Sequence, residues 1–156
     1  DNKVAVQTQV YGPEARGGAS MSQVVIDDEQ ILYPKVSIPD IYVIMSQEGF
    51  EKYGVSAPPE ATMLVDSTLV HSRPACTFIE VPATREAKEK LGRDIVANVV
   101  MLGVLAGRYG SFGDAALTSV LEEFFPKKDF LLLNKKALEA GMVFGAQARA
   151  DQKGMP

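Results

Sequence analysis

A glycine-rich loop with one arginine is the segment whose residues are best suited to chemistry. Residues 11–20 read YGPEARGGAS. Gly12, Gly17 and Gly18 permit backbone conformations and close approaches that other residues resist. Arg16 carries a planar set of donors that fits a carboxylate or a phosphate. Backbone amides freed by glycine, beside an arginine, favour an anion-binding loop.

Two further residues of this loop bear on its interpretation, Tyr11 as a candidate binding residue and Glu14 as a partner of Arg16. Tyr11 offers an aromatic face and a hydroxyl, and Glu14 places a carboxylate two residues before Arg16. A surface ion pair between Glu14 and Arg16, in an ordinary connection between two strands, explains the same residues. Spacing alone favours that interpretation over a binding site.

A second polar group follows a strand that the sequence predicts to be buried. Asp66, Ser67 and Thr68 come directly after the apolar residues 62–65. Ligands of open α/β sheets gather at the carboxyl ends of the strands, so Ser67 and its neighbours are a candidate binding position. A simple polar turn explains them equally well.

Asn98 is a third candidate, because it lies in a run of residues that predicts a central helix. Residues 96–109 are apolar on nearly all sides of a helix. An amide buried there must find hydrogen-bond partners or cost about 1–3 kcal/mol. We therefore expect Asn98 to tie two elements together or to belong to an interface. Gly103 and Gly107, on the same helix, predict that another element approaches closely.

The single histidine, His71, and the single cysteine, Cys76, limit the available chemistry. One thiol forms no internal disulfide and supplies one of the four thiolates of an iron–sulfur cluster. One histidine excludes a multi-histidine zinc site. A hydrolase would need His71 within reach of Ser67, whereas a solvated loop histidine is the favoured alternative. Cys76 is expected in the core, and no residue is assigned a catalytic or metal-binding role.

Several function classes are disfavoured by what the sequence lacks. It contains no GxGxxG turn, no GxxxxGK[ST] loop, no GxSxG elbow and no Gly-Asp-Gly motif for magnesium and thiamine diphosphate. The net charge of −4 argues against nucleic-acid binding. The longest uncharged apolar stretch, residues 95–107, is shorter than the about 20 residues of a membrane span. With no recognisable signal peptide, we expect a soluble, cytoplasmic protein.

Hydrophobic periodicity predicts strands in the first half of the chain and helices after residue 83. Strands are expected over residues 4–9, 21–26, 41–45, 62–65 and 77–81, with an extended piece over 31–33 and a short helix over 47–53. Later helices are expected from the cap Thr84 to Leu91, over 96–109, around a face formed by Leu117, Val120, Leu121 and Phe124, and after the cap Asp129 around a face formed by Phe130, Leu133, Ala137 and Ala140.

This order of elements predicts one α/β domain. Strands interleaved with helices indicate a three-layer α/β/α, Rossmann-like fold with a mostly parallel mixed sheet and a helical C-terminal part. The domain is expected over residues 1–147, followed by a frayed polar tail over 148–156.

Pieces spread along the chain occur in the order found in one known family. They are YGPEARGGAS at 11–20, residues 28–36, Pro39-Asp40, Asp66-Ser67 with Leu69-Val70, VPAT at 81–84, NVVMLGVLAG at 98–107 and NKKALEAG at 134–141. Together they resemble the gamma subunit of 2-oxoacid:ferredoxin oxidoreductases, the 2-oxoglutarate branch in particular, over nearly all of residues 3–145. Family members begin with a strand and a GxGGQG-like turn, which this sequence lacks, and we expect an upstream segment.

The resemblance implies a subunit that is inactive alone. Such a complex decarboxylates a 2-oxoacid on thiamine diphosphate with magnesium, passes electrons through iron–sulfur clusters to ferredoxin and transfers the acyl group to coenzyme A. Alpha, beta and ferredoxin-like partner subunits would hold those cofactors, and this chain would bind none by itself. Contacts to coenzyme A or to a subunit would come from Tyr11, Gly12, Glu14, Arg16, Gly17, Gly18, Ser67 and Asn98.

A stand-alone α/β nucleotide-binding module with a regulatory or carrier role is the alternative. It predicts a closed pocket at the carboxyl ends of the strands and a well-covered surface. The subunit predicts an exposed apolar patch on the order of several hundred Å². Neither interpretation decides whether the isolated chain forms a homodimer.

Overall fold

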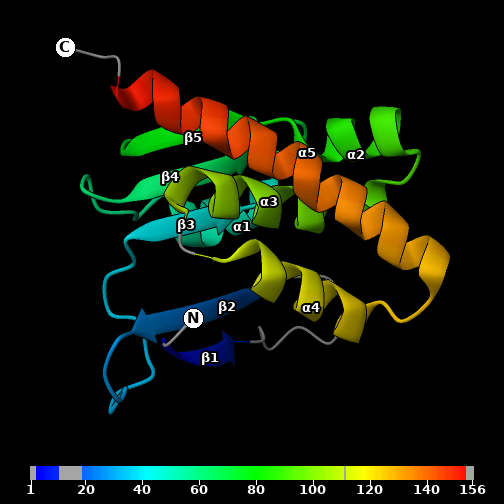
Figure 1. Ribbon diagram of the computed structural model, residues 1–156. Coiled ribbons are helices and arrows are strands. Elements are labelled where there is room, and N and C mark those ends of the chain that lie inside the picture. The colour runs from blue at the N-terminus through cyan, green and yellow to red at the C-terminus, as the bar shows by residue number, and fades with distance from the viewer. Residues whose placement is uncertain (1–2, 11–18, 111, 154–156) are drawn as a thin grey trace. The chain divides into compact units, whose positions relative to one another are not determined.

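The computed structural model describes residues 3–10, 19–110 and 112–153 (Figure 1). The chain divides into two compact units. The first comprises Asp1–Val65 and Leu69–Glu80, and the second comprises Asp66–Thr68 and Val81–Pro156. The α/β class, the parallel pairing within a three-stranded sheet and the helical C-terminal part are confirmed.

The first unit contains a β-hairpin and most of a three-stranded sheet. The hairpin pairs β1 (Val4–Val10) with β2 (Met21–Asp27) in antiparallel register, with Val6 opposite Val25. The sheet has the order β3 (Ile41–Ile44), β4 (Thr62–Asp66) and β5 (Thr77–Val81). Between β3 and β4 lie the short helix α1 (Gln47–Gly49) and the π-helical turn η1 (Phe50–Gly54).

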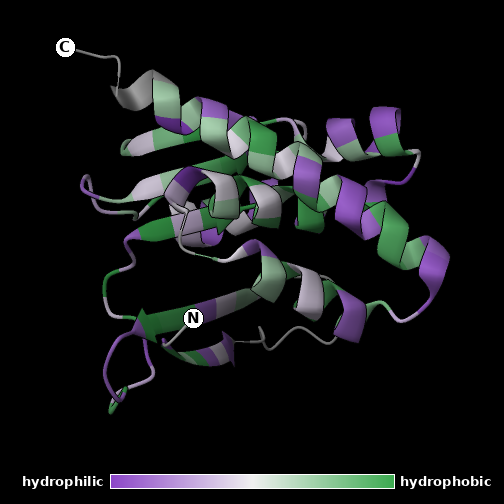
Figure 2. Ribbon diagram, in the orientation of Figure 1, coloured by the Kyte–Doolittle hydropathy of each residue, from purple (hydrophilic) through white to green (hydrophobic). Residues whose placement is uncertain are grey.

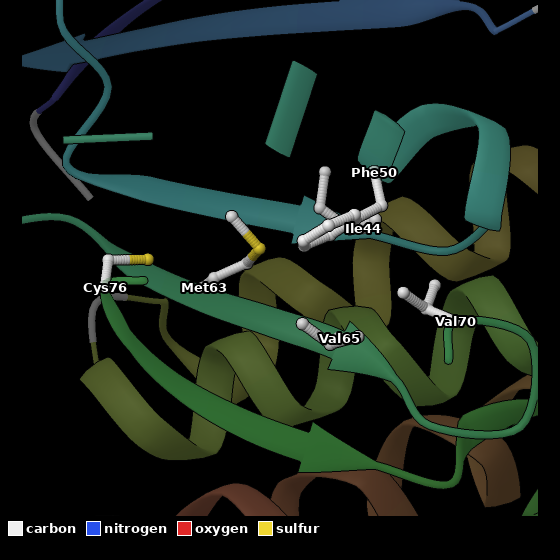
Figure 3. Packing of buried hydrophobic residues seen from close by; sticks show 6 residues of the cluster. All are labelled: Ile44, Phe50, Met63, Val65, Val70 and Cys76. Carbon is white, nitrogen blue, oxygen red and sulfur yellow. The ribbon is translucent and has the colours of Figure 1, made fainter. Parts of the chain in front are cut away.

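The core of the first unit forms on β3, β4 and the segments that follow them. Figure 3 shows six side chains of this core: Ile44, Phe50, Met63, Val65, Val70 and Cys76. Each is less than 9% exposed, and two of them, Met63 and Val65, lie on β4, the central strand of the sheet. The expectation that Cys76 is a small core residue is confirmed.

Two expectations for the first unit are wrong. The continuous apolar run at residues 41–45 is typical of a strand buried on both faces, but Val43 is 42% exposed. The reason is the strand order, which places β3 at the edge of the described sheet. The extended piece expected over residues 31–33 is an irregular part of the connection from β2 to β3.

The second unit is helical apart from its strand ends. Its elements are α2 (Ala83–Leu91), the 3₁₀ turn η2 (Asp94–Val96), α3 (Ala97–Tyr109), α4 (Asp114–Phe124) and α5 (Lys128–Lys153). α2 ends where predicted, at Gly92, whose φ of 75° is the left-handed conformation that glycine tolerates. Within α2, Glu86 and Lys90 are spaced i and i+4 and form an ion pair of 2.5 Å.

Glycines bring α3 and α5 into backbone contact. A Cβ on Gly103 would lie 2.9 Å from the Cα of Gly141 and closer still to the carbonyl oxygen of Leu138. One turn on, Gly107 lies against the backbone of Met142, and Gly145 lies against that of Val104. The predicted close approach along the small-residue stripe is therefore confirmed, and its partner is α5.

The buried surface of α5 differs from the face expected for it. Hydrophilic and hydrophobic residues alternate along this helix (Figure 2). Asn134, Ala137, Gly141 and Gly145 are buried, whereas Phe130 and Ala140 are exposed. The small residues of α5 face α3, because they permit the backbone contact between the two helices.

Other expected helix details also need correction. On α4, Leu117 and Leu121 are buried, but Val120 and Phe124 are 46% and 71% exposed, so only part of the predicted apolar face packs inward. Asp129 lies inside the first turn of α5 instead of capping it. Residues 148–153, expected to fray, continue α5 as helix.

We predict that Gly103→Leu disrupts the α3–α5 contact. The added side chain would meet backbone atoms of α5, and overpacking of this kind typically costs about 1–3 kcal/mol. Thermal unfolding of the full chain measures the effect. Ala140→Leu, at an exposed position next to Gly141, is the matched control and should leave the melting temperature within about 2 °C of the wild type. Equal stability of the two variants would contradict the prediction.

Candidate functional site

The first unit contains a hollow of about 420 Å³ beside the point where the chain returns from the glycine-rich loop. Its walls come from the start of β2, from Val36 and Pro39 before β3, from β3 itself, and from the turn that carries α1 and η1. Tyr11, Gly12, Glu14, Arg16, Gly17 and Gly18 lie outside the described residues. The described part of the candidate site therefore begins at Ala19.

Ala19 is held through both of its backbone polar groups. Its N–H donates to Oε1 of Glu48 at 3.0 Å, and its carbonyl oxygen accepts from the hydroxyl of Tyr53 at 3.3 Å. The residue is 6% exposed. These two bonds fix the start of β2 against α1 and η1, and they fix where the loop ends.

Local capping places Glu48 in that position. The Oγ of Ser46 accepts the N–H of Gly49 at 3.0 Å, which begins α1 directly after β3. Glu48 lies in the first turn that follows. Glu48 and Tyr53 are not among the residues predicted from the sequence, because nothing in their local pattern indicates a partner about thirty residues away.

The described polar groups that line the hollow are neutral. No lysine, arginine or histidine is found among the described residues that line it. Ser22 and Gln23 are engaged within the first unit, with Gln7 donating to the Oγ of Ser22 at 2.8 Å and Gln23 donating to the carbonyl oxygen of Val36 at 3.5 Å. The described walls offer hydroxyl and amide groups but no positive charge for an anion.

Tyr42 lines the hollow from β3 and also packs against the core. Burial raises the pKa of its phenol above the ordinary value of about 10, and the nearby thiol of Cys76, once ionised, raises that pKa further. At neutral pH the phenol is therefore protonated and can donate a hydrogen bond.

The turn expected at the end of β4 is tied to the start of α2. Asp66 is fully buried, and its Oδ1 accepts the N–H of Thr68 at 3.0 Å. Its Oδ2 accepts both the N–H and the hydroxyl of Thr84, at 3.1 and 2.6 Å. The N–H of Ser67 donates to the carbonyl oxygen of Val81 at 3.0 Å. The carboxylate thereby satisfies donors of the first turn of α2. The N-cap residue of this helix, Pro82, makes no side-chain cap of its own.

This arrangement corrects the role expected of Thr84. The sequence predicts that Thr84 caps α2, but the residue lies inside the helix and donates to Asp66. The capping acceptor comes from the preceding strand, a relation that helix-start patterns in a sequence do not reveal.

None of the remaining candidates is among the described residues that line the hollow. Asn98 lies on the exposed side of α3, where its Oδ1 accepts the N–H of Val99 at 2.9 Å, so the expected burial of its amide is wrong. His71 is exposed, and its backbone N–H donates to Gln47 at 2.9 Å. Ser67 belongs to the second unit and His71 to the first.

Two kinds of feature are absent from the part of the chain that the structure describes. No group of three histidine, cysteine, aspartate or glutamate side chains there is placed to hold a metal ion. No helix there combines the length and apolar content needed to cross a bilayer.

Comparison with known proteins gives consistent matches. Residues 2–144 match the family model described as pyruvate ferredoxin/flavodoxin oxidoreductase. The 2-oxoglutarate synthase subunit KorC of Methanocaldococcus jannaschii is 44% identical over 131 residues, which cover 81% of this chain and 70% of that protein. The ketoisovalerate oxidoreductase subunit VorA of Methanothermobacter thermautotrophicus is 34% identical over 134 residues, covering 84% of this chain and 28% of that protein.

A solved structure agrees with these matches. The crystal structure of the keto/oxoacid ferredoxin oxidoreductase gamma subunit from Geobacter sulfurreducens superposes with a TM-score of 0.77 at 34% identity. The superposition covers 93% of this chain and 82% of that one.

We predict that Asp66→Asn destabilises the protein by about 1–3 kcal/mol, because the amide turns an acceptor into a donor that faces other donors. Urea unfolding of the full chain measures the loss. Asp94→Asn, at an exposed position in η2, is the control and should change stability by less than about 0.5 kcal/mol. Equal midpoints for the two variants would show that the tie contributes nothing.

We also predict that Tyr42 makes folding sensitive to alkaline pH. Because its pKa is raised in the folded state, its contribution to stability is full below about pH 10 and is lost as the pH rises through the folded-state pKa. Phenolate absorbance, taken as the difference between the wild type and Tyr42→Phe, should give a midpoint above the ordinary value.

Cys76→Ala separates the two causes of this raised pKa. It should bring the Tyr42 midpoint down while leaving it above the ordinary value, since burial is the larger cause. A Tyr42 midpoint at or below the ordinary value in the wild type would contradict the assignment.

Proposed function

The chain belongs to the pyruvate ferredoxin/flavodoxin oxidoreductase family, and from that premise we propose that it is the gamma-type subunit of a 2-oxoglutarate:ferredoxin oxidoreductase. In this reaction one 2-oxoglutarate and one coenzyme A yield succinyl-coenzyme A, carbon dioxide and a proton. The two electrons released reduce two oxidised ferredoxins. The chain itself provides no reacting group in this proposal.

The observation that carries the substrate assignment is the match to KorC. Identity is 44% over most of both chains, against 34% for VorA, which is named for ketoisovalerate. The glycine-rich loop YGPEARGGAS, on which the resemblance was first based, lies inside the matched residues.

The chemistry of the residues supports placing the cofactors on partner subunits. An iron–sulfur cluster needs four thiolates, whereas this sequence has one cysteine, which lies in the core. Magnesium and thiamine diphosphate need oxygen ligands grouped around the ion, and the described residues present no acidic cluster for them. In the proposed reaction, therefore, no bond is made or broken by a group of this chain.

In our proposal this chain contributes to the binding of coenzyme A. The hollow beside Ala19 offers neutral hydroxyl and amide groups, and the backbone at Ala19 is fixed by Glu48 and Tyr53. Arg16 lies three residues before Ala19 and would supply the positive charge that the described walls lack. Arg16, with the amides of Gly17 and Gly18, would bind an anionic part of coenzyme A.

Isolation of the whole complex tests the proposal. The full chain, tagged and co-expressed with its partner subunits, should co-purify with subunits that hold thiamine diphosphate and iron–sulfur clusters. The complex should reduce ferredoxin with 2-oxoglutarate and coenzyme A, and the chain alone should not. Recovery of the chain without such subunits, or a preference for pyruvate, would contradict it.

We predict that Arg16→Ala raises the apparent KM for coenzyme A about 10-fold or more in the assembled complex. Loss of one charge-assisted hydrogen bond corresponds to about 1.5–3 kcal/mol of binding free energy. The KM for 2-oxoglutarate and the yield of complex should stay unchanged. Arg85→Ala, at an exposed position on α2, is the control. Wild-type kinetics for both variants would remove Arg16 from the site.

A further inference from the structure

The connection from β2 to β3, residues 28–40, exposes apolar side chains in an unusual concentration. Leu32 and Ile38 are the two most exposed large hydrophobic residues of the described chain, at 88% and 74%, and Tyr33 is 66% exposed. Single exposed apolar residues are ordinary on a protein surface, but three within seven residues mark a place where another molecule binds.

This segment is held to the first unit and has no helix or strand of its own. Oδ1 of Asp27 accepts the N–H groups of Asp28 and Glu29, at 2.7 and 3.2 Å, and Lys3 pairs with Asp28 at 2.6 Å. Further along, the carbonyl oxygen of Val36 accepts from Gln23. In Figure 1 the segment leaves the end of β2, turns and returns to β3. A connection of this length without secondary structure usually has a function.

Charge indicates what kind of surface the segment fits. Carboxylates outnumber ammonium groups two to one beside these apolar residues: Asp27, Asp28, Glu29 and Asp40 against Lys3 and Lys35. A second copy of this chain would bring the same acidic rim and be repelled. An apolar patch with lysine or arginine at its rim is complementary.

The relatives indicate where such a patch would be found. The region that matches this chain makes up 28% of VorA but 70% of KorC. In VorA the domain is thus covalently joined to a larger polypeptide, whereas in KorC it forms most of the chain. A domain that occurs in both forms needs a docking surface in the separate form to replace the covalent link.

We propose that residues 28–40 are the surface by which this chain docks on an apolar, basic-rimmed patch of another subunit of its oxidoreductase. This inference rests on the proposed function and specifies one interface of that complex. Leu32, Tyr33 and Ile38 enter the apolar part of the patch, and Asp28 and Glu29 face its basic rim.

Co-purification of the tagged full chain with its partner subunits tests the apolar part. Leu32→Ser with Ile38→Ser should lower the recovery of partner subunits at least 10-fold, while circular dichroism and the melting temperature of the isolated chain stay unchanged. The matched control, Val55→Ser with Ile95→Ser, changes residues of 67% and 71% exposure elsewhere and should recover partners like the wild type.

Glu29→Arg tests the rim independently. It should weaken assembly about 10-fold at low ionic strength, and the difference from the wild type should shrink as salt screens the interaction. Wild-type recovery by both the double serine variant and Glu29→Arg would overturn the inference. The inference would also be overturned if the variants lost only the ability to form homodimers, measured by light scattering, while their binding to partner subunits stayed intact.

The failure of this inference and the failure of the proposed function are distinguishable. If the wild-type chain recovers no oxidoreductase subunit, the function itself is wrong. If the wild type recovers its partners and the variants in residues 28–40 do so equally well, the function stands and the docking surface lies elsewhere.

Discussion

The backbone contact between α3 and α5 is the constraint on which the second unit depends. Gly103 meets Gly141, Gly107 meets the backbone of Met142 and Gly145 meets that of Val104, and at each of these glycines a Cβ would overlap the backbone of the opposite helix. The contact fixes the rotation of α5, since its glycine side must face α3. α2 and α4 also pack against α5, so a register set by four glycines places the other helices of this unit.

Asp66 imposes a similar constraint at the entrance to this unit. Its buried carboxylate accepts from Thr68 and Thr84, which ties the end of β4 to the start of α2. The N-terminus of a helix attracts anions because its first N–H groups are unpaired. Here the carboxylate of Asp66 already accepts hydrogen bonds from two donors of the first turn of α2. This strand end is therefore a structural tie.

The parts of the structure that could be predicted from sequence are those decided by local pattern. Alternation and apolar runs gave the strands, and the spacing of Gly103 and Gly107 gave the close approach of a helix. The predictions that were wrong or missing concern features that depend on contacts with residues distant in the sequence. Val120 and Phe124 fit an apolar helical face by spacing, yet the neighbours of α4 cover only part of that face. The bond from Ala19 to Glu48 likewise has no local signature.

Charge distribution connects the candidate site with the need for partners. The described walls of the hollow beside Ala19 carry hydroxyl and amide groups, and a phosphate placed there would keep its charge uncompensated. A doubly charged group in a partly dry site requires a cation, because desolvation without a counter-charge is costly. In the proposed function Arg16 would supply one such cation. A second would come from another polypeptide, so the proposed site would be complete only in a complex whose other subunits face the same hollow.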